Sequence, residues 1–347
     1  MRSFAARRRG HVTRVNVRVA GAAVLLALPV LAGCGGNQNA LHPEGHAERR
    51  IAHLWWVMLT GASVGFAVIV LLLLLGWVRR NRPGLPFGGG ERAATQLLLF
   101  LGVCLPIATL TALFLWSDVF VIRSTAAPRA ASTPGRRPMT IRVIGHQWFW
   151  EVRYDGTRAV TANEIHIPIR TRVHVVGTTD DVIHSFWIPE LNRKVDLIPG
   201  RRNRVLLEAD EPGVYRGQCS EFCGLQHAHM AVEVVAEPAA RFRAWLAREA
   251  APARATDSTK GKALFASEQC SGCHTIRGTD AAGKVGPDLT HLAGRRTLAA
   301  LTIPNTREYL RLWIADPQHF KPGNKMPALR LTTGQIDALV SYLEGLK

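Results

Sequence analysis

Acidic residues are scarce in this chain of 347 residues. Its 26 aspartates and glutamates stand against 43 lysines and arginines, which gives a formal charge of +17. An excess of positive charge is typical of proteins that bind nucleic acid. The arginines are scattered, however, and six of them lie in the first 18 residues, where no acidic side chain faces them; without these six the charge falls to about +11. We therefore expect no nucleic-acid partner.

The sequence also lacks the patterns of a catalytic chain. It has no internal repeat and no grouping of acid, base and nucleophile of the kind that forms a catalytic site. Its cysteines number only six, but four of them form two close pairs, Cys219 with Cys223 and Cys270 with Cys273. Close pairs indicate metal, cofactor or redox chemistry. The length of the chain predicts two or three domains.

The first 34 residues have the pattern of an export signal. A basic start is followed by an apolar run from Val19 to Ala32 and by the sequence Leu31-Ala32-Gly33-Cys34. This ending resembles the lipobox of bacterial lipoproteins. The resemblance implies a signal peptide over residues 1–33, cleavage before Cys34 and a lipid on the Cys34 thiol outside the cytoplasm. An uncleaved signal anchor and an ordinary signal peptide are the alternatives.

Two uncharged segments, residues 54–78 and 95–117, are long enough to cross a bilayer as helices. Between them lie Arg79, Arg80 and Arg82, and the positive-inside rule places this short loop in the cytoplasm. Pro106 interrupts the second segment, but a neighbouring helix can satisfy the carbonyl that it frees. Residues 34–123 are therefore predicted to form a transmembrane hairpin with both ends outside.

The rest of the chain has the composition of two globular domains with linkers. Residues 124–138, rich in Pro, Ala and Ser, indicate a linker. Residues 139–237 alternate in short runs between turn signals, which predicts an all-β sandwich or barrel. Residues 238–257 are predicted to be a second linker that contains a short amphipathic piece. Residues 258–347 have helical signals, among them a capping box at Thr332 and Gln335.

The strongest chemical signal is a cluster of soft ligands in the β segment. Cys219, Cys223, His227 and Met230 fall within twelve residues, and His184 lies about 35 residues before them. Thiolates with imidazole select copper or zinc, and the thioether favours copper in an electron-transfer role. A structural zinc site more often has two CxxC or CxxH pairs. A Cys219–Cys223 disulfide is the other alternative, and it would leave His227 and Met230 without a role.

The run C-x-E-x-C-G-x-x-H-x-x-M from Cys219 to Met230 resembles the binuclear copper motif, CuA, of cytochrome c oxidase subunit II. Segments 145–150, 181–189 and 194–200 resemble other parts of that family, so the likeness covers about residues 50–236 and includes the hairpin. It implies a cupredoxin-like barrel for residues 139–237, with Cys219 and Cys223 bridging two coppers. The implied copper ligands are His184, Cys219, the Glu221 carbonyl, Cys223, His227 and Met230.

The same resemblance implies roles for residues near the copper. Trp148 would be the point where external electrons pass toward CuA, and a packed barrel tryptophan is the alternative. The Glu221 side chain would face subunit I, where the family has a magnesium ion. Glu91 would correspond to a carboxylate at the mouth of a proton channel, although acidic residues beside membrane spans are common. The family spacing assigns the ligand to His227 and not to His229.

Cys270-Ser-Gly-Cys273-His274 is the attachment signature of a covalent c-type haem. Its two thiols bond to the haem vinyl groups and its histidine binds the iron. Segments 286–289 and 321–327 resemble the proximal and distal loops of small c-type cytochromes, which implies Met326 as the sixth ligand. His291 and His319 compete for that position. For the alternatives, the sequence has neither the second ligand pair of a zinc knuckle nor the βαβ pattern of a thioredoxin.

These observations predict a multidomain electron-transfer chain. Its parts are a lipoprotein signal, a two-helix transmembrane hairpin, an all-β cupredoxin-like CuA domain and an all-α class I cytochrome c domain over residues 258–347. The likeness is to a caa-type subunit II of a bacterial inner membrane, with copper and haem c on the periplasmic side. Membrane association and other oxidase subunits as partners are therefore expected.

The resemblance also implies a direction of electron flow. Electrons would pass from a soluble or membrane-bound cytochrome c to the haem, to CuA and then to subunit I, which holds haem a and copper B, reduces dioxygen to water and translocates protons. A CuA-containing subunit of a nitric oxide reductase is one alternative. A membrane-tethered copper carrier is another, from a different functional class, but it gives no reason for a covalent haem.

Overall fold

The structure is a computed structural model that describes residues 36, 38–80, 90–123, 138–254 and 258–347. Residues 40–347 form one compact unit. The predicted signal peptide, Cys34 and nearly all of the linker at 124–138 lie outside the described residues. The loop between the two predicted spans, residues 81–89, lies outside them as well.

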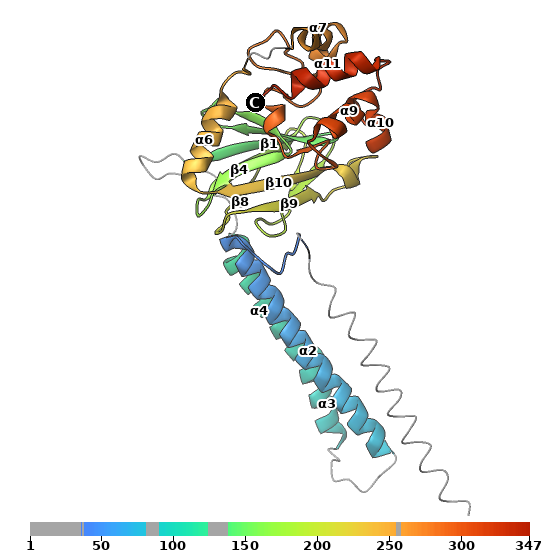
Figure 1. The fold of residues 1–347 in the computed structure, drawn as a ribbon. Helices are drawn as coiled ribbons and strands as arrows, with labels where there is room; N and C mark the ends of the chain where they lie inside the picture. The colour runs from blue at the N-terminus through green and yellow to red at the C-terminus, as the bar shows by residue number, and fades with distance from the viewer. Residues whose placement is uncertain (1–35, 37, 81–89, 124–137, 255–257) are drawn as a thin grey trace, which may run out of the picture. The chain divides into compact units, whose positions relative to one another are not determined.

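Two long apolar helical segments run side by side before the β domain (Figure 1). The first is α2, His46–Arg80. The second is continuous from Glu91 to Ile122 and comprises α3 (Glu91–Leu99), η1 (Phe100–Cys104), α4 (Leu105–Trp116) and η2 (Ser117–Ile122). Residues 46–78 and 91–122 are long and apolar enough to cross a membrane, and the most apolar 18-residue windows in them have mean hydropathies of 2.6 and 2.4. The predicted spans at 54–78 and 95–117 fall within these helices.

The second helical segment accommodates Pro106 without ending. A proline lacks an N–H group and its ring clashes with the carbonyl four residues earlier, which here is that of Gly102. Gly102 lies in η1, where the helix widens to a π-helical turn. A π-turn moves carbonyls away from the proline ring, and it is a usual way for a helix to absorb such a defect.

The β domain consists of two five-stranded sheets, as the alternating pattern predicted. One has the order β3-β2-β1-β5-β8 and the other the order β4-β10-β9-β6-β7. The pairs β1–β5 and β4–β10 are parallel, and the other neighbours are antiparallel. The strands are β1 (Thr140–His146), β2 (Phe149–Tyr154), β3 (Val160–Ala162), β4 (Glu164–Pro168), β5 (Val173–Thr179), β6 (His184–Trp187), β7 (Val195–Leu197), β8 (Asn203–Leu207), β9 (Gly213–Cys219) and β10 (Ala231–Glu237).

Apolar side chains at alternate strand positions fill the space between the sheets. In β5, every second residue from Val173 to Thr179 is buried. Trp150, Phe186 and Ile141 are among the largest side chains that are completely buried. The two inner faces therefore share one core, and this core fixes the strand ends from which the copper loop emerges.

Residues 238–257, which were predicted to be a second linker, are partly helical. They contain α6, Ala239–Ala250, which packs against the barrel in Figure 1. Phe242 and Trp245 lie one helical turn apart and both join the barrel core, and Trp245 stacks on His166 with the ring centres 4.0 Å apart. The composition of residues 238–257 is that of a linker, but these two aromatic side chains attach its first half to the barrel.

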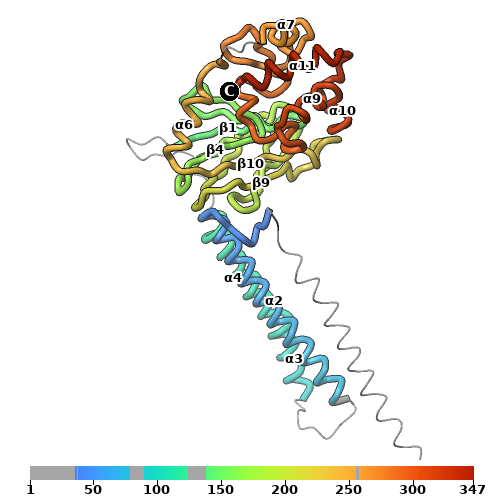
Figure 2. Tube along the Cα trace, in the orientation of Figure 1, coloured from blue at the N-terminus to red at the C-terminus, as the bar shows by residue number. Residues whose placement is uncertain are grey.

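The C-terminal domain is mainly helical. Its helices are α7 (Thr259–Ser267), α8 (Cys270–Cys273), α9 (Arg307–Ala315), α10 (Pro317–Phe320) and α11 (Thr333–Leu343), with a two-stranded ribbon of β11 (Thr297–Leu298) and β12 (Ile303–Pro304). The predicted capping box is confirmed, because the side chains of Thr332 and Gln335 exchange hydrogen bonds with each other's backbone N–H. Figure 2 shows α7 against α11, where Phe265 meets Tyr342 with ring centres 5.8 Å apart.

Gly261 allows α7 and α11 to cross closely, because a Cβ there would overlap the carbonyl oxygen of Ala338 and approach the Tyr342 Cβ to 2.6 Å. We expect Gly261→Ala to destabilise the C-terminal domain by about 2 kcal/mol, since an added methyl group in a packed contact forces the backbones apart. Thermal loss of the haem absorbance in the purified complex measures this. Gly334→Ala is the control, because nothing lies within 4 Å of a Cβ there. Equal melting of both variants and the wild type would contradict the close-crossing argument.

Candidate metal and haem centres

The segment from the end of β9 to the start of β10 brings five of the six predicted copper ligands together. Cys219 is the last residue of β9, His227 lies in the short turn η3 (His227–His229), and Met230 directly precedes β10. Because β9 and β10 are antiparallel neighbours, the loop returns to where it began, and the backbone N–H of Cys219 donates to the Met230 carbonyl at 2.9 Å. Cys219 and Cys223 are free and buried, with their Sγ atoms 3.7 Å apart.

The remaining ligands surround this sulfur pair. His184, the first residue of β6, is completely buried, with its Nδ1 3.8 Å from Cys219 Sγ. On the other side, His227 Nδ1 lies 3.6 Å and Met230 Sδ 3.8 Å from Cys223 Sγ. The Glu221 carbonyl oxygen lies 3.2 Å from Cys219 Sγ. All six predicted ligands thus converge, and this set of sulfur and imidazole, with His184, both cysteines and Met230 buried, fits copper.

The two thiols are electrostatically coupled. The hydrogen bond from Cys223 lowers the pKa of the Cys219 thiol, and the same bond raises the pKa of Cys223. Loss of the proton from one thiol therefore makes its loss from the other harder. A bound cation that accepts both thiolates removes this conflict, because metal binding displaces ligand protons.

Asp181 orients His184, a contact that the sequence reasoning did not identify. Its Oδ1 lies 2.9 Å from His184 Nε2, on the ring edge away from the sulfur atoms. Burial alone would raise the pKa of Asp181, but hydrogen bonds from His184 and from the backbone of Gln147 and Val182 hold it far below its usual range. A carboxylate behind a ligating histidine fixes the ring and its tautomer. The segment 181–189 contained this residue, but only the fold brings it behind the imidazole.

Gly145 on β1 provides the space for His184. A Cβ at this position would lie 2.7 Å from the His184 ring.

Two further residues of the copper loop lie outside the ligand cluster. The Glu221 side chain is about half exposed and lies 3.7 Å from Lys194 Nζ. His229 points elsewhere, with its Nδ1 2.8 Å from Gln226 Oε1. These positions agree with the spacing argument that prefers His227 over its neighbour.

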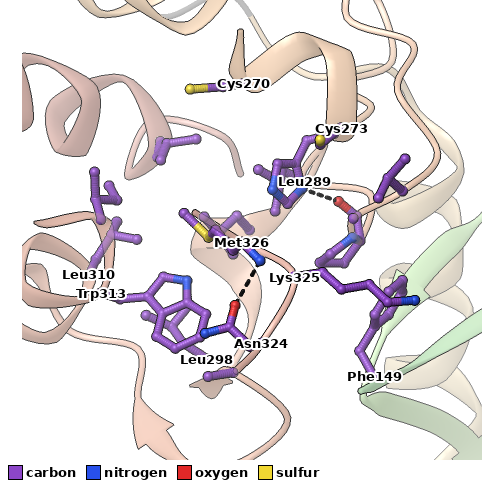
Figure 3. A pocket seen from close by; sticks show the side chains of 18 of the residues that line it. Phe149, Cys270, Cys273, Leu289, Leu298, Leu310, Trp313, Asn324, Lys325 and Met326 are labelled. Atoms are coloured by element: carbon purple, nitrogen blue, oxygen red, sulfur yellow. Dashed lines mark hydrogen bonds between the residues drawn. The ribbon is translucent and has the colours of Figure 1, made fainter. Parts of the chain in front are cut away.

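A second centre lies in the C-terminal domain, around a cavity of about 290 Å³ (Figure 3). Cys270 and Cys273 border it on one side and Met326 on the other, and Trp313 and Leu310 also line it. Most of its other lining side chains are apolar, among them Phe265, Leu289, Leu292, Leu298, Leu339 and Leu343. An apolar cavity with two thiols, an imidazole and a thioether on its walls fits a covalent haem.

His274 is held in place by the loop that the sequence indicated. Its Nδ1 donates to the Pro287 carbonyl at 2.8 Å, which leaves Nε2 as the nitrogen available to an iron. Gly286 lies so close to the ring that a Cβ there would approach Nδ1 to 2.8 Å. Burial lowers the pKa of His274, so the neutral, ligating form is favoured.

Met326 is the distal candidate that borders the cavity. Its backbone is anchored on both sides, because its N–H donates to Asn324 Oδ1 at 2.8 Å and its carbonyl accepts from Gln318 Nε2 at 2.8 Å. The competing histidines do not line the cavity. His291 Nε2 instead lies 3.0 Å from the Ala251 carbonyl, and His319 packs against Phe320.

Trp148 connects the two centres. Together with Gln147 and Phe149 it lines the C-terminal cavity, although Gln147 and Trp148 form the turn between β1 and β2 of the barrel and Phe149 begins β2. Its indole Nε1–H donates to the carbonyl oxygen of Cys223 at 2.9 Å, and Gln147 Nε2 donates to the same oxygen at 2.8 Å. One side chain therefore touches both the wall of the haem cavity and the copper loop.

Comparisons with known proteins agree with this arrangement. Residues 157–237 match the family of the cytochrome c oxidase subunit II periplasmic domain, and residues 258–347 match the cytochrome c family. Cytochrome c oxidase subunit 2 of Alkalihalophilus pseudofirmus is 32% identical over 332 residues, which cover 91% of this chain and 94% of that protein. The chain belongs to the cytochrome c oxidase subunit 2 family.

Other relatives match parts of the chain. Cytochrome c oxidase subunit 2 of Bacillus sp. (strain PS3) is 33% identical over 227 residues, which are 61% of this chain and 63% of that protein. The solved periplasmic domain of subunit II of cytochrome oxidase from Bradyrhizobium japonicum is 30% identical and covers 33% of this chain and 98% of that one, with a TM-score of 0.32.

Membership of this family establishes the general role of the chain. It is an electron-transfer subunit of an oxidoreductase complex and works with other oxidase subunits such as subunit I. It is a membrane protein with periplasmic domains, and its two domain families imply copper and haem.

The contact between Asp181 and His184 makes a prediction about copper affinity. We expect Asp181→Asn to weaken copper binding by about tenfold or more, because loss of a carboxylate behind a ligating histidine typically has an effect of that size. Copper retained per chain against a competing chelator measures it. The exposed neighbour Asp180 provides a matched control, Asp180→Asn. If both variants retain copper like the wild type, Asp181 does not support the site.

The anchored position of Met326 makes a prediction about the haem. We expect Met326→Leu to remove the absorption band of a thioether–iron bond and to lower the haem potential, because a methionine axial ligand raises that potential. His291→Gln and His319→Gln should leave both properties unchanged. A spectrum of bis-histidine type in the wild-type chain would contradict the assignment.

Proposed function

We propose that this chain carries electrons from an external donor to subunit I of a respiratory cytochrome c oxidase, by way of a covalent haem c and a binuclear CuA centre. The contact of Trp148 with both the haem cavity and Cys223 carries this proposal. A copper carrier would not need a haem site beside its copper ligands. We therefore favour electron relay over copper delivery.

The copper ligands in this proposal are His184, Cys219, the Glu221 carbonyl, Cys223, His227 and Met230. When bound, the copper pair accepts and releases one electron at a time. The chain's contribution is a rigid cage: the ligands come from β6, β9 and the loop before β10, whose strands share a packed core. A cage that moves little when its charge changes favours fast transfer.

The haem ligands in this proposal are His274 and Met326, with thioether bonds to Cys270 and Cys273. The hydrogen bond from His274 to Pro287 orients the imidazole, and the apolar cavity wall excludes water. Trp148 serves as the connection toward copper, and its hydrogen bond to Cys223 supports this role.

The placement of the chain in the membrane completes the proposal. We infer a signal peptide over residues 1–33, a lipid on Cys34, and a hairpin of two spans with both globular domains on the periplasmic side of a bacterial inner membrane. The domain limits proposed are 34–123, 139–237 and 258–347, with linkers at 124–138 and 238–257. The Glu221 side chain is proposed to face a magnesium ion at subunit I. A cytochrome c, soluble or membrane-bound, is the proposed donor.

The purified complex tests this proposal. We expect two copper atoms and one covalent haem per chain, together with dioxygen uptake that depends on a reduced cytochrome c. Nitric oxide reduction without dioxygen uptake would replace the oxidase by the nitric oxide reductase alternative, and copper without a covalent haem would contradict the relay. The intact mass of the subunit tests Cys34, because a chain that still begins at Met1 carries no such lipid.

A further inference from the structure

Lys321 is an unusual lysine because it is almost completely buried, with 3% of its surface exposed. It follows α10 and begins the loop that leads to Met326. Lysine side chains are rarely buried unless their charge is matched, since an ammonium group loses its hydration there. The site described above assigns Lys321 no role.

Its Nζ lies within hydrogen-bond distance of three backbone carbonyl oxygens. Lys321 Nζ donates to the carbonyl oxygens of His229 at 2.9 Å, Trp148 at 3.1 Å and Ala299 at 3.3 Å. His229 belongs to the copper loop and Trp148 to the turn between β1 and β2, whereas Ala299 belongs to the C-terminal domain. A single side chain of the C-terminal domain therefore binds both barrel segments that border the copper ligands.

Other contacts between the C-terminal domain and the barrel surround the hydrogen bonds of Lys321. Gln226 Nε2 donates to the Pro322 carbonyl at 2.5 Å, and a Cβ at Gly323 would lie 2.7 Å from Leu225. Farther out, Lys325 lies 3.6 Å from Asp181 and Arg296 lies 3.2 Å from Glu233, and both of these cations are more than half exposed. Exposed ion pairs contribute little to stability, whereas removal of a buried donor leaves its buried acceptors without partners, which costs more.

The position of Lys321 affects the geometry between the two centres. The turn of Gln147 and Trp148, with Phe149 at the start of β2, forms part of the haem cavity wall, and Trp148 donates its indole N–H to the Cys223 carbonyl. Within the barrel this wall is held by the hydrogen bonds of Gln147 and Trp148 to Cys223, and across to the C-terminal domain Lys321 is the buried side chain that binds the Trp148 carbonyl. Lys321 ties the turn to the loop of Met326.

We propose that Lys321 is a positioning residue for electron transfer between haem and copper: by binding the carbonyls of Trp148 and His229, it holds the Gln147–Phe149 turn as a wall of the haem cavity. This inference rests on the proposed relay function. It adds that the haem pocket is completed by the copper barrel, and that one buried ammonium group maintains the contact.

Lys321→Met in the full complex tests the inference. The methionine keeps much of the side-chain length and removes the three N–H donors. After a photoexcited dye delivers one electron to the haem, we expect the transfer from haem to copper to slow by about tenfold or more, because small displacements of oriented reaction partners have effects of that order. Amide hydrogen exchange in Gln147–Phe149 should become faster, since the turn loses its buried tie.

Two controls separate positioning from damage. The first control is Lys262→Met, which removes an exposed lysine of α7. The complex with this substitution should transfer electrons from haem to copper at the wild-type rate. The copper electron paramagnetic resonance signal and the haem spectrum of Lys321→Met should match the wild type, which shows that both centres are intact. If Lys321→Met does not accumulate, Lys321→Gln takes its place, because it retains donors on a side chain one bond shorter and should give an intermediate rate.

The outcomes distinguish this inference from the function on which it rests. Wild-type transfer rates and wild-type exchange in the Lys321 variants would overturn the positioning role while leaving the relay intact. Absence of transfer from haem to copper in the wild-type complex, with both groups bound, would instead overturn the relay itself.

Discussion

Two hydrogen bonds to one carbonyl oxygen fix the barrel residues that lie between the copper loop and the cavity of the C-terminal domain. The Trp148 indole and the Gln147 amide both donate to the Cys223 oxygen, and both side chains also line the cavity of the C-terminal domain. The copper loop and the haem cavity therefore share a wall. Because that wall is a tight turn between two barrel strands, the separation of the two centres depends on the barrel core and not on a flexible linker.

The barrel core, α6 and the C-terminal domain all restrain the region around this turn. Trp150 and Phe186 are buried in the barrel core, and α6 packs its aromatic residues on the barrel. The C-terminal domain adds its own restraints on α6, since Arg277 donates to the Glu249 carbonyl at 2.7 Å. Close packing holds the metal ligands rigid, and rigid ligands rearrange little when an electron arrives. The packing of the domains therefore supports the electron-transfer role.

Sequence reasoning identified what lies in short motifs. The residues from Cys219 to Met230 and from Cys270 to His274 are close in the chain, and the apolar spans and the capping box are local patterns too. It did not identify Asp181 behind His184 or Lys321 beneath Trp148, because Lys321 and Trp148 are separated by 173 residues and only the fold brings them together. The α6 segment was assigned to a linker from its composition, although the spacing of Phe242 and Trp245 already indicated a buried face. Lipidation of Cys34 stays a prediction.

The most direct test of the central claim is transient absorbance of the wild-type complex after one electron is delivered to the haem. The shared wall predicts that the haem becomes oxidised and the copper reduced with one common rate constant, which does not change when the complex is diluted. A rate that rises with the concentration of the complex, or copper that is reduced before the haem, would show that electrons reach copper by another route.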